Sequence, residues 1–151
     1  MSKRVPFETT LEVRDCCLCL HAQRAARALA RRFDEVLRPA GLTNQQFSLL
    51  MALNRPEPPT MAPVAELLGL DRTTLTAALK PLERRGLVVV EGDTADRRSR
   101  RVRLTTDGHA VLLRTLPVWK QTHAEIGSAH PGVDMDQLRM SLRELGSDVT
   151  P

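Results

Sequence analysis

The stretch Arg97-Arg98-Ser99-Arg100-Arg101-Val102-Arg103 holds five arginines in seven residues. It lies between two short β-like runs, Leu87–Val90 and Val102–Thr105, and Glu91–Asp96 before it is rich in turn-forming residues. This pattern predicts a β-hairpin whose tip carries guanidinium groups. Such a tip suits phosphate groups and a narrow groove, because a narrow groove concentrates negative potential and favours arginine.

A helix-turn-helix pattern precedes the predicted hairpin. Thr60–Leu68 is a short apolar helix, and Gly69-Leu70 makes a turn. Asp71 is a favourable N-cap for a second, polar helix that runs towards Arg85. Pro81 removes one backbone donor and is expected to kink or shorten the end of that helix.

The positive charge of the chain is concentrated in this segment. From Asp71 to Arg103 there are nine basic and five acidic residues, a surplus of four, so the rest of the chain balances at 13 of each (22 − 9 and 18 − 5). A local surplus predicts a polyanionic partner, because each neutralised phosphate releases condensed counterions; a merely solvated arginine loop is the alternative. Aromatic residues make up only 3% and tyrosine is absent, which argues against modules that stack single-stranded bases.

The N-terminal part of the chain predicts two helices. Leu11–Leu37 reads as one long helix with apolar residues at three- and four-residue spacings, and Pro39–Gly41 ends it. Thr43 caps a second helix, which runs to Leu53. The prolines of Asn54–Pro59 exclude helix and predict a rigid, extended loop.

The C-terminal part predicts two more helices. One runs from Thr106 to about Ile126, the chain breaks over 127–133, and Asp134 caps a last helix that ends near Leu145. The apolar stripes of the first and last helices have too few partners in one small domain, which predicts a core shared with a second copy of the chain. A two-fold reader of DNA needs such a dimer to place two recognition helices about one helical turn apart.

Three segments carry a family resemblance, and they occur in the family's order: Gly41–Phe47, then Leu67–Leu75 with Leu82–Val88, then Asp96-Arg97-Arg98 with Val102–Gly108. The last is similar to the D-x-R…LT-x-x-G wing signature of the MarR family of winged helix-turn-helix transcriptional regulators. The resemblance covers roughly Leu11 to Leu145.

The resemblance implies a mainly α fold, a winged helix-turn-helix with a small β-hairpin wing and long terminal dimerisation helices. It implies one MarR-like domain over 1–151, with dimerisation helices at 11–38 and 106–146 and a DNA-binding lobe at 43–105. The implied function is sequence-specific double-stranded DNA binding by a homodimeric transcriptional regulator, usually a repressor on a pseudopalindromic operator. No H-E-x-x-H, G-x-S-x-G or glycine-rich phosphate loop occurs. We therefore predict neither an enzyme nor a cofactor.

Residue roles follow from the matched positions. Arg98 is expected to enter the minor groove, with Asp96 bracing it within the wing. The other DNA-binding candidates are Arg72, Thr73, Thr74, Thr76, Lys80, Arg97, Arg100 and Arg101. Residues early in a recognition helix reach base edges, although the two threonines nearest Asp71 also suit helix capping. Because strand residues alternate between faces, not every wing arginine can reach DNA.

The cysteines allow several interpretations. Cys16, Cys17 and Cys19 form an odd, bunched set, which does not predict a disulfide framework. Cys16 aligns with the reactive cysteine of peroxide-sensing, OhrR-type members, but those members rely on tyrosines that this chain lacks. With Cys16 and Cys19 expected on one helix face, three readings stay open: buried interface residues, a redox switch, or a metal site completed by His21 or His123. A metal-handling or thiol enzyme is the alternative of another class.

The effector is expected to be small and mostly apolar, with an aromatic acid favoured over an oxidant. The missing tyrosines argue against the peroxide-sensing arrangement, and arginines of the first helix could pair with a carboxylate. His21, Phe47 and Trp119 are the candidates for lining its site, and Trp119 is also expected at the dimer core.

The sequence also predicts a cytoplasmic location. No run approaches the about 18 apolar residues of a membrane span. Met1–Pro6 is basic but lacks the apolar region of a secretory signal.

Overall fold

The computed structural model describes residues 4–147. The described residues do not include Met1–Lys3 or 148–151. Both ranges belong to the domain predicted over 1–151, and the first also belongs to the N-terminal segment Met1–Pro6 considered above. The elements are α1 (Phe7–Cys16), α2 (Leu18–Leu37), the short 3₁₀ helix η1 (Arg38–Ala40), α3 (Asn44–Leu53), α4 (Met61–Leu68), α5 (Arg72–Arg84), β1 (Val88–Gly92), β2 (Arg100–Leu104), α6 (Thr106–Ala129) and α7 (Met135–Ser147). The mainly helical fold with one antiparallel hairpin agrees with the fold class predicted from the sequence.

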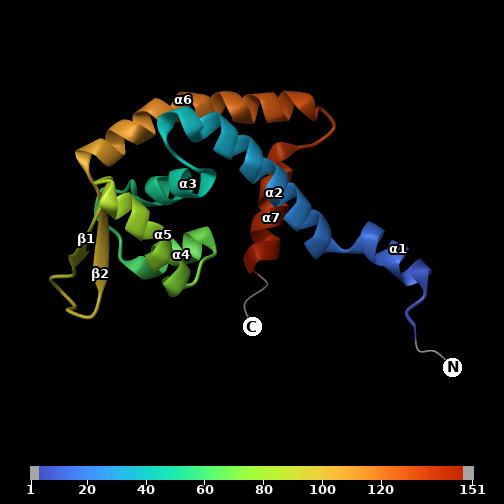
Figure 1. Ribbon diagram of the computed structural model, residues 1–151, viewed down its shortest axis with the longest axis horizontal. Helices are drawn as coiled ribbons and strands as arrows, with labels where there is room; N and C mark the ends of the chain where they lie inside the picture. The colour runs from blue at the N-terminus through green and yellow to red at the C-terminus, as the bar shows by residue number, and fades with distance from the viewer. Residues whose placement is uncertain (1–3, 148–151) are drawn as a thin grey trace.

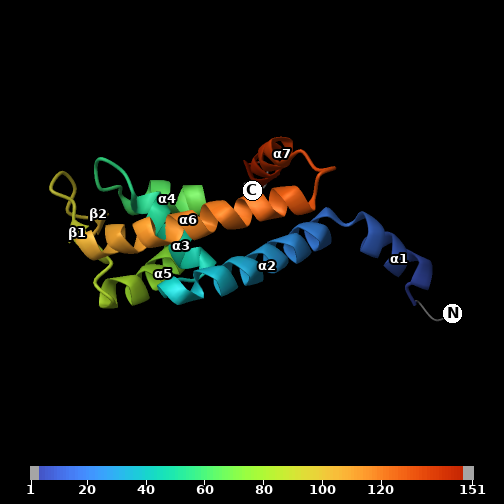
Figure 2. The same cartoon turned by 90° about the horizontal axis from the view of Figure 1, so that it is seen from above.

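Two long helices form the frame of the molecule. α2 and α6 pack against each other, and both contact α3 (Figures 1 and 2). α4 and α5 lie on the other side of α3 from α6, and the β1–β2 hairpin projects from the same end of the molecule (Figure 1). α1 extends beyond the opposite end of the molecule. After α6 the chain turns back into α7, which lies away from the hairpin and α5.

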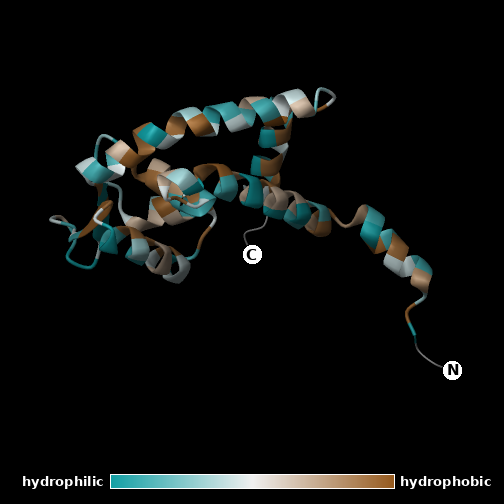
Figure 3. Cartoon of the chain, turned by 45° about the horizontal axis from the view of Figure 1, so that its top comes forward, coloured by the Kyte–Doolittle hydropathy of each residue, from teal (hydrophilic) through white to brown (hydrophobic). Residues whose placement is uncertain are grey.

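The core lies in the lobe built by α3, α4, α5 and the hairpin. Its fully buried side chains include Leu50 of α3, Leu75 and Leu82 of α5, and Val102 of β2. Hydrophobic residues gather in this lobe, whereas the outlying α1 and α7 carry hydrophobic and hydrophilic residues side by side (Figure 3). The ends of α2 and α6 nearest the lobe contribute to the same core, through Leu37 of α2 and Val111 and Leu112 of α6.

The predicted N-caps are confirmed. The Thr43 hydroxyl accepts the Gln46 N–H at 3.2 Å and the Gln46 side chain accepts the Thr43 N–H at 3.1 Å, a reciprocal capping box. Asp71 caps α5. That helix continues through Pro81 to Arg84, so the proline does not shorten it.

The predicted continuous helix Leu11–Leu37 is wrong. Cys17 has an extended backbone with ψ of 107°, and it separates α1 from α2. Its Sγ accepts the Leu20 N–H at 3.4 Å and so caps the start of α2. Apolar periodicity misses this break, because both helices keep the helical spacing and sulfur is a rare, weak cap.

Other boundaries shift by a few residues. The helix predicted to end near Ile126 runs to Ala129, so only the later part of the predicted break is non-helical. Both strands extend nearer to the hairpin tip than predicted, with Gly92 paired to Arg100. Over residues 4–147, none of the helices has the length and apolarity to traverse a lipid bilayer.

Candidate nucleic-acid interface

The start of α5 is organised by Asp71. Its carboxylate accepts the Thr74 N–H at 2.7 Å and the Thr74 hydroxyl at 2.9 Å. These hydrogen bonds, the backbone one first, hold the pKa of Asp71 below its ordinary value. One face of α5 enters the core through Leu75, Leu79 and Leu82. The opposite face, which begins at Arg72, is exposed.

The polar side chains of α5 differ in how far they are already engaged. The Thr74 hydroxyl belongs to the cap, as the capping alternative anticipated, and the Thr76 hydroxyl donates to the Arg72 carbonyl at 2.8 Å. Among residues 4–147, the side chains of Arg72, Thr73 and Lys80 make no hydrogen bond or ion pair. These three present unpaired donors outward from α5.

The wing loop between β1 and β2 is ordered by its own backbone. Asp96 Oδ1 accepts the Arg98 N–H at 2.9 Å, and the Asp96 carbonyl accepts the Ser99 N–H at 3.0 Å. The Asp93 N–H donates to the Ser99 carbonyl at 3.0 Å and closes the base of the loop. Asp96 therefore braces the backbone of Arg98 and leaves its guanidinium unengaged by that carboxylate.

The wing arginines divide into two groups. Arg101 pairs with Asp93 and donates to the Pro58 carbonyl, and Arg103 pairs with Glu91 at 3.0 Å. The second group has exposed side chains and makes no hydrogen bond or ion pair within the described residues: Arg97, Arg98 and Arg100. Arg101, a candidate DNA contact by sequence, is thus largely occupied within the protein.

Sequence reasoning missed how the wing is anchored to α6. The Thr105 hydroxyl donates to the Gly86 carbonyl at 2.6 Å and accepts the Gly108 N–H at 3.1 Å. The Thr105 N–H donates to the Leu87 carbonyl at 3.1 Å. The LT-x-x-G part of the wing signature contains both Thr105 and Gly108, and it was the available signal for this junction.

The candidate effector residues do not all meet. Phe47 and Trp119 stack with ring centroids 6.1 Å apart, and the Trp119 ring lies 4.2 Å from the His123 ring. The rings of Phe47 and Trp119 border a cavity of about 310 Å³, whose other lining residues are Ser48, Met51, Ala52, Leu67 and Leu116. Within the chain, the Trp119 ring contacts Phe47 and His123, and no charged side chain lines the cavity.

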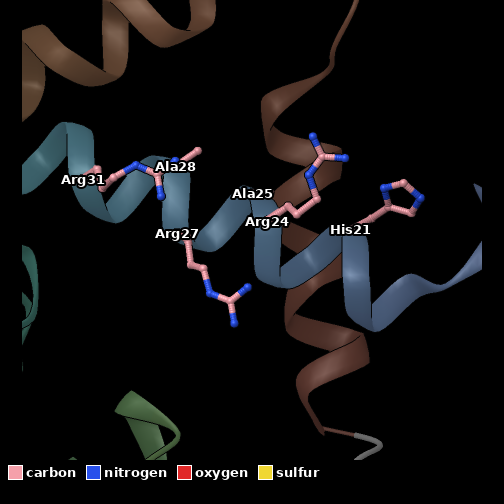
Figure 4. Close-up of a pocket in the computed structure, with 6 residues that line it drawn as sticks. All are labelled: His21, Arg24, Ala25, Arg27, Ala28 and Arg31. Atoms are coloured by element: carbon pink, nitrogen blue, oxygen red, sulfur yellow. The ribbon is translucent and has the colours of Figure 1, made fainter. Parts of the chain in front are cut away.

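His21 lies elsewhere, on the surface of α2. It borders a hollow of about 530 Å³ whose lining consists of His21, Arg24, Ala25, Arg27, Ala28 and Arg31. All six residues belong to one helix and their side chains fan outward from it (Figure 4). The structure therefore does not bring the arginines of α2 to the cavity beside Trp119, and one site cannot use both within a single chain.

The cysteines surround the break between α1 and α2. Cys16 and Cys19 are exposed and lie on different helices, so the prediction that they share one helix face is wrong. Cys17 is partly buried, and Cys19 Sγ accepts from the Gln23 side chain at 3.3 Å. Across the part of the chain that is described, no three His, Cys, Asp or Glu side chains converge as metal ligands would.

A helix-turn-helix of α4 and α5 followed by an arginine-bearing hairpin defines a winged helix-turn-helix, the architecture of DNA-binding transcriptional regulators. The sequence matches the MarR family over residues 40–99. The transcriptional regulator MosR of Mycobacterium tuberculosis, solved in complex with DNA, is 38% identical, with a TM-score of 0.79 over 87% of this chain and 95% of that one.

Two further relatives agree. The repressor CouR of Rhodococcus jostii, solved on a DNA duplex, is 28% identical, with a TM-score of 0.72 over 92% of this chain and 96% of its own. The organic hydroperoxide resistance transcriptional regulator of Bacillus subtilis is 29% identical over 85% of this chain and 86% of its own. This chain belongs to the MarR family and is a DNA-binding transcriptional regulator, as the three sequence motifs predicted.

Proposed function

We propose that the protein is a homodimeric repressor that binds a pseudopalindromic, double-stranded operator through α5 and the wing. The observation that carries this proposal is the wing loop. Asp96 fixes the backbone of Arg98 while the Arg98 guanidinium has no partner within the described residues, so an ordered loop presents an unneutralised cation. The DNA complexes of MosR and CouR support the same use of the fold here.

The proposed contacts follow from which side chains are unengaged. Arg98 enters the minor groove, and Arg97 and Arg100 approach the phosphates beside it. Arg72, Thr73 and Lys80 face the major groove and its backbone from α5. Thr74, Thr76 and Arg101, whose side chains have partners inside the protein, serve the interface indirectly.

Selection from a random duplex pool tests this proposal. The protein should enrich a two-fold repeated sequence with half-site centres about 34–36 Å apart. Binding to that sequence should exceed binding to a scrambled duplex by about a thousandfold or more at matched salt. Enrichment of no sequence, or of a single half-site, would contradict a dimeric, sequence-specific reader.

The dimer is supported by apolar side chains that one chain leaves exposed. Neither α1 nor α7 contains a buried residue. Phe7 and Val13 of α1 are 69% and 54% exposed, and Leu142 of α7 is 51% exposed. A second copy would remove this apolar surface from water, which favours association by about 25 cal/mol per Å² buried.

The effector we propose is a small apolar or aromatic ligand in the cavity beside Trp119. The cavity is walled by α3, α4 and α6, and α4 leads through Gly69 directly into α5. A ligand there releases DNA only by binding the non-operator shape of the dimer more tightly. Because the α2 arginines do not line the cavity, a neutral ligand fits it better than the aromatic acid expected from the sequence.

A redox response is the second candidate, and two observations favour it. Cys16 and Cys19 are exposed on either side of a helix break, and a hydroperoxide resistance regulator is among the relatives. In this chemistry one thiolate attacks an organic hydroperoxide, becoming a sulfenic acid and releasing the alcohol; the second thiol then condenses with it to form a disulfide and water.

An operator-binding assay with and without peroxide decides between the two candidates. If the redox candidate holds, peroxide should release the wild-type protein from the operator and a thiol reductant should restore its binding. Operator binding by Cys16→Ser should then be insensitive to peroxide. Operator binding that peroxide leaves unchanged in wild type would exclude this candidate and leave the ligand response.

A further inference from the structure

Three residues fasten the wing to the loop between α3 and α4. Arg101 Nε lies 3.1 Å from Asp93 Oδ1, and Arg101 Nη1 donates to the Pro58 carbonyl at 2.6 Å. The Asp93 side chain is only 8% exposed and that of Arg101 38%. In the neighbouring pair, Glu91 and Arg103 are each about half exposed. We call Asp93, Arg101 and Pro58 the wing clamp.

Backbone contacts place the clamp at the free edge of β2. The Val102 N–H donates to the Pro59 carbonyl at 3.0 Å, and Thr60 forms an isolated antiparallel bridge with Arg101. The segment before α4 therefore runs along the edge of β2 that β1 does not occupy. A two-stranded hairpin alone is marginally stable in water, so this third segment supports the wing against the lobe.

Asp93 also belongs to the loop that carries Arg98. Its Oδ1 accepts the Ala95 N–H at 3.1 Å, besides pairing with Arg101. Both contacts, that of Ala95 first, keep the pKa of Asp93 below its ordinary value. One carboxylate thus joins the wing loop to Arg101, and Arg101 joins it to the Pro58 carbonyl.

We propose that the wing clamp is a positioning device for operator recognition: Asp93 and Arg101 set the direction of the Arg98 loop before DNA arrives, and neither needs to contact DNA. This inference rests on the proposed operator binding. Charge-assisted hydrogen bonds at a largely buried carboxylate hold one geometry well. A loop that is already directed also loses less conformational freedom on binding, so affinity rises without a new contact.

The sign of one mutational effect separates this role from general electrostatics. Asp93→Asn removes a negative charge from the DNA-facing lobe, which by charge alone strengthens binding to phosphates. A clamp predicts the opposite for the operator, a loss of about tenfold, because coupled contacts of this kind are typically worth that much. Binding to a scrambled duplex should stay equal or become slightly tighter.

Three further variants complete the test. Arg101→Met should lose about the same factor for the operator, and the double variant with Asp93→Asn should be no worse than Arg101→Met alone, because both break one device. Arg101→Lys keeps the charge but not the two-pronged contact, so it should lose operator affinity with an unchanged salt slope. Glu91→Gln is the matched control, because it makes the same charge change two residues before Asp93 but in an exposed pair, and it should bind the operator equally or more tightly.

Folding of each variant is checked first, by its circular dichroism spectrum and its thermal unfolding midpoint. Operator affinities are then compared only among variants whose spectrum and midpoint match those of wild type. The inference is overturned if Asp93→Asn tightens operator binding, or if the two single effects add. It is also overturned if Arg101→Met weakens operator and scrambled DNA alike with a salt slope smaller by about one, which is the mark of a direct phosphate contact. If the proposed operator binding is itself wrong, the result is different: the wild-type protein then binds the operator and the scrambled duplex equally well.

Discussion

Gly108 lies so close to Leu87 that a Cβ at Gly108 would overlap the Leu87 carbonyl oxygen. The same carbonyl accepts the Thr105 N–H, so the first turn of α6 rests directly on the chain where α5 passes into β1. The segment that joins α5 to β1 and the first turn of α6 thus meet at one backbone contact. We therefore expect a movement of α6 relative to the lobe to displace the end of α5 and the start of β1 together.

Gly108→Ala should therefore destabilise the fold. The added methyl group forces the backbone of α6 away from Leu87, and overpacking of this kind costs about 1–3 kcal/mol. Urea unfolding measures the loss. Gly127→Ala in the same helix meets no atom within 4 Å and is the matched control; it should raise the free energy of unfolding by about 0.5–1 kcal/mol, because alanine favours helix over glycine. Equal effects at both positions would contradict the close-contact account.

Arg98→Ala should weaken operator binding by about 1–3 kcal/mol, the usual scale for a groove arginine. Part of the loss should vanish at high salt, because one cation no longer neutralises phosphate. Fluorescence anisotropy with labelled operator measures it at two salt concentrations. Arg114→Ala, at an exposed position of α6, makes the same charge change away from the wing and should have little effect. A folded Arg98→Ala protein that binds as wild type does would remove the wing from recognition.

The sequence predicted what is decided locally. Thr43 and Asp71 each cap a helix by accepting a hydrogen bond from the residue three positions later, so their patterns could be recognised in the sequence. The wing clamp could not be predicted from the sequence, because Pro58 and Arg101 are far apart along the chain. An arginine that contacts DNA also cannot be told by residue type from one that pairs within the protein. For the same reason, composition could not tell that His21 and Trp119 lie at different sites.

The proposed dimer predicts the effect of charge in α7. Leu138, Leu142 and Leu145 recur at four- and three-residue spacing and form one exposed stripe. Leu142→Glu should shift sedimentation from dimer towards monomer and lower operator affinity with it, because a buried, unpaired carboxylate opposes association. Met140→Glu, off the stripe, is the control and should stay largely dimeric. Two variants that both sediment and bind as wild type would place the interface elsewhere.

Acid should loosen the junction between α2 and α3. The Asn44 backbone N–H donates to Asp34 at 2.7 Å and the Asn44 side chain at 2.8 Å, and these two bonds lower the pKa of Asp34. A lowered folded-state pKa contributes stability that is present above the unfolded value of about 4 and is lost as pH falls through the folded value. Asp34→Asn keeps an acceptor but does not titrate, so its free energy of unfolding should fall less than that of wild type below about pH 4. Parallel pH profiles would contradict this role.

The single tryptophan makes the effector proposal directly measurable. Trp119 is the only tryptophan and the chain has no tyrosine, so emission excited at long wavelength reports on the wall of the proposed cavity alone. Hydrocinnamamide, a neutral aromatic probe, should change this emission saturably and release labelled operator over the same concentration range. Hydrocinnamate, of nearly the same shape, should bind about tenfold more weakly, because no cation lines the cavity to compensate for the desolvated carboxylate.

Two variants test whether the response comes from this cavity. Leu67→Glu places a charge in the lining and should abolish the amide response, whereas Leu113→Glu, at an exposed position of α6 outside the cavity, should leave it intact. Tighter binding of the acid would instead assign recognition to the arginines of α2, and Arg24→Ala would then be the variant that loses it.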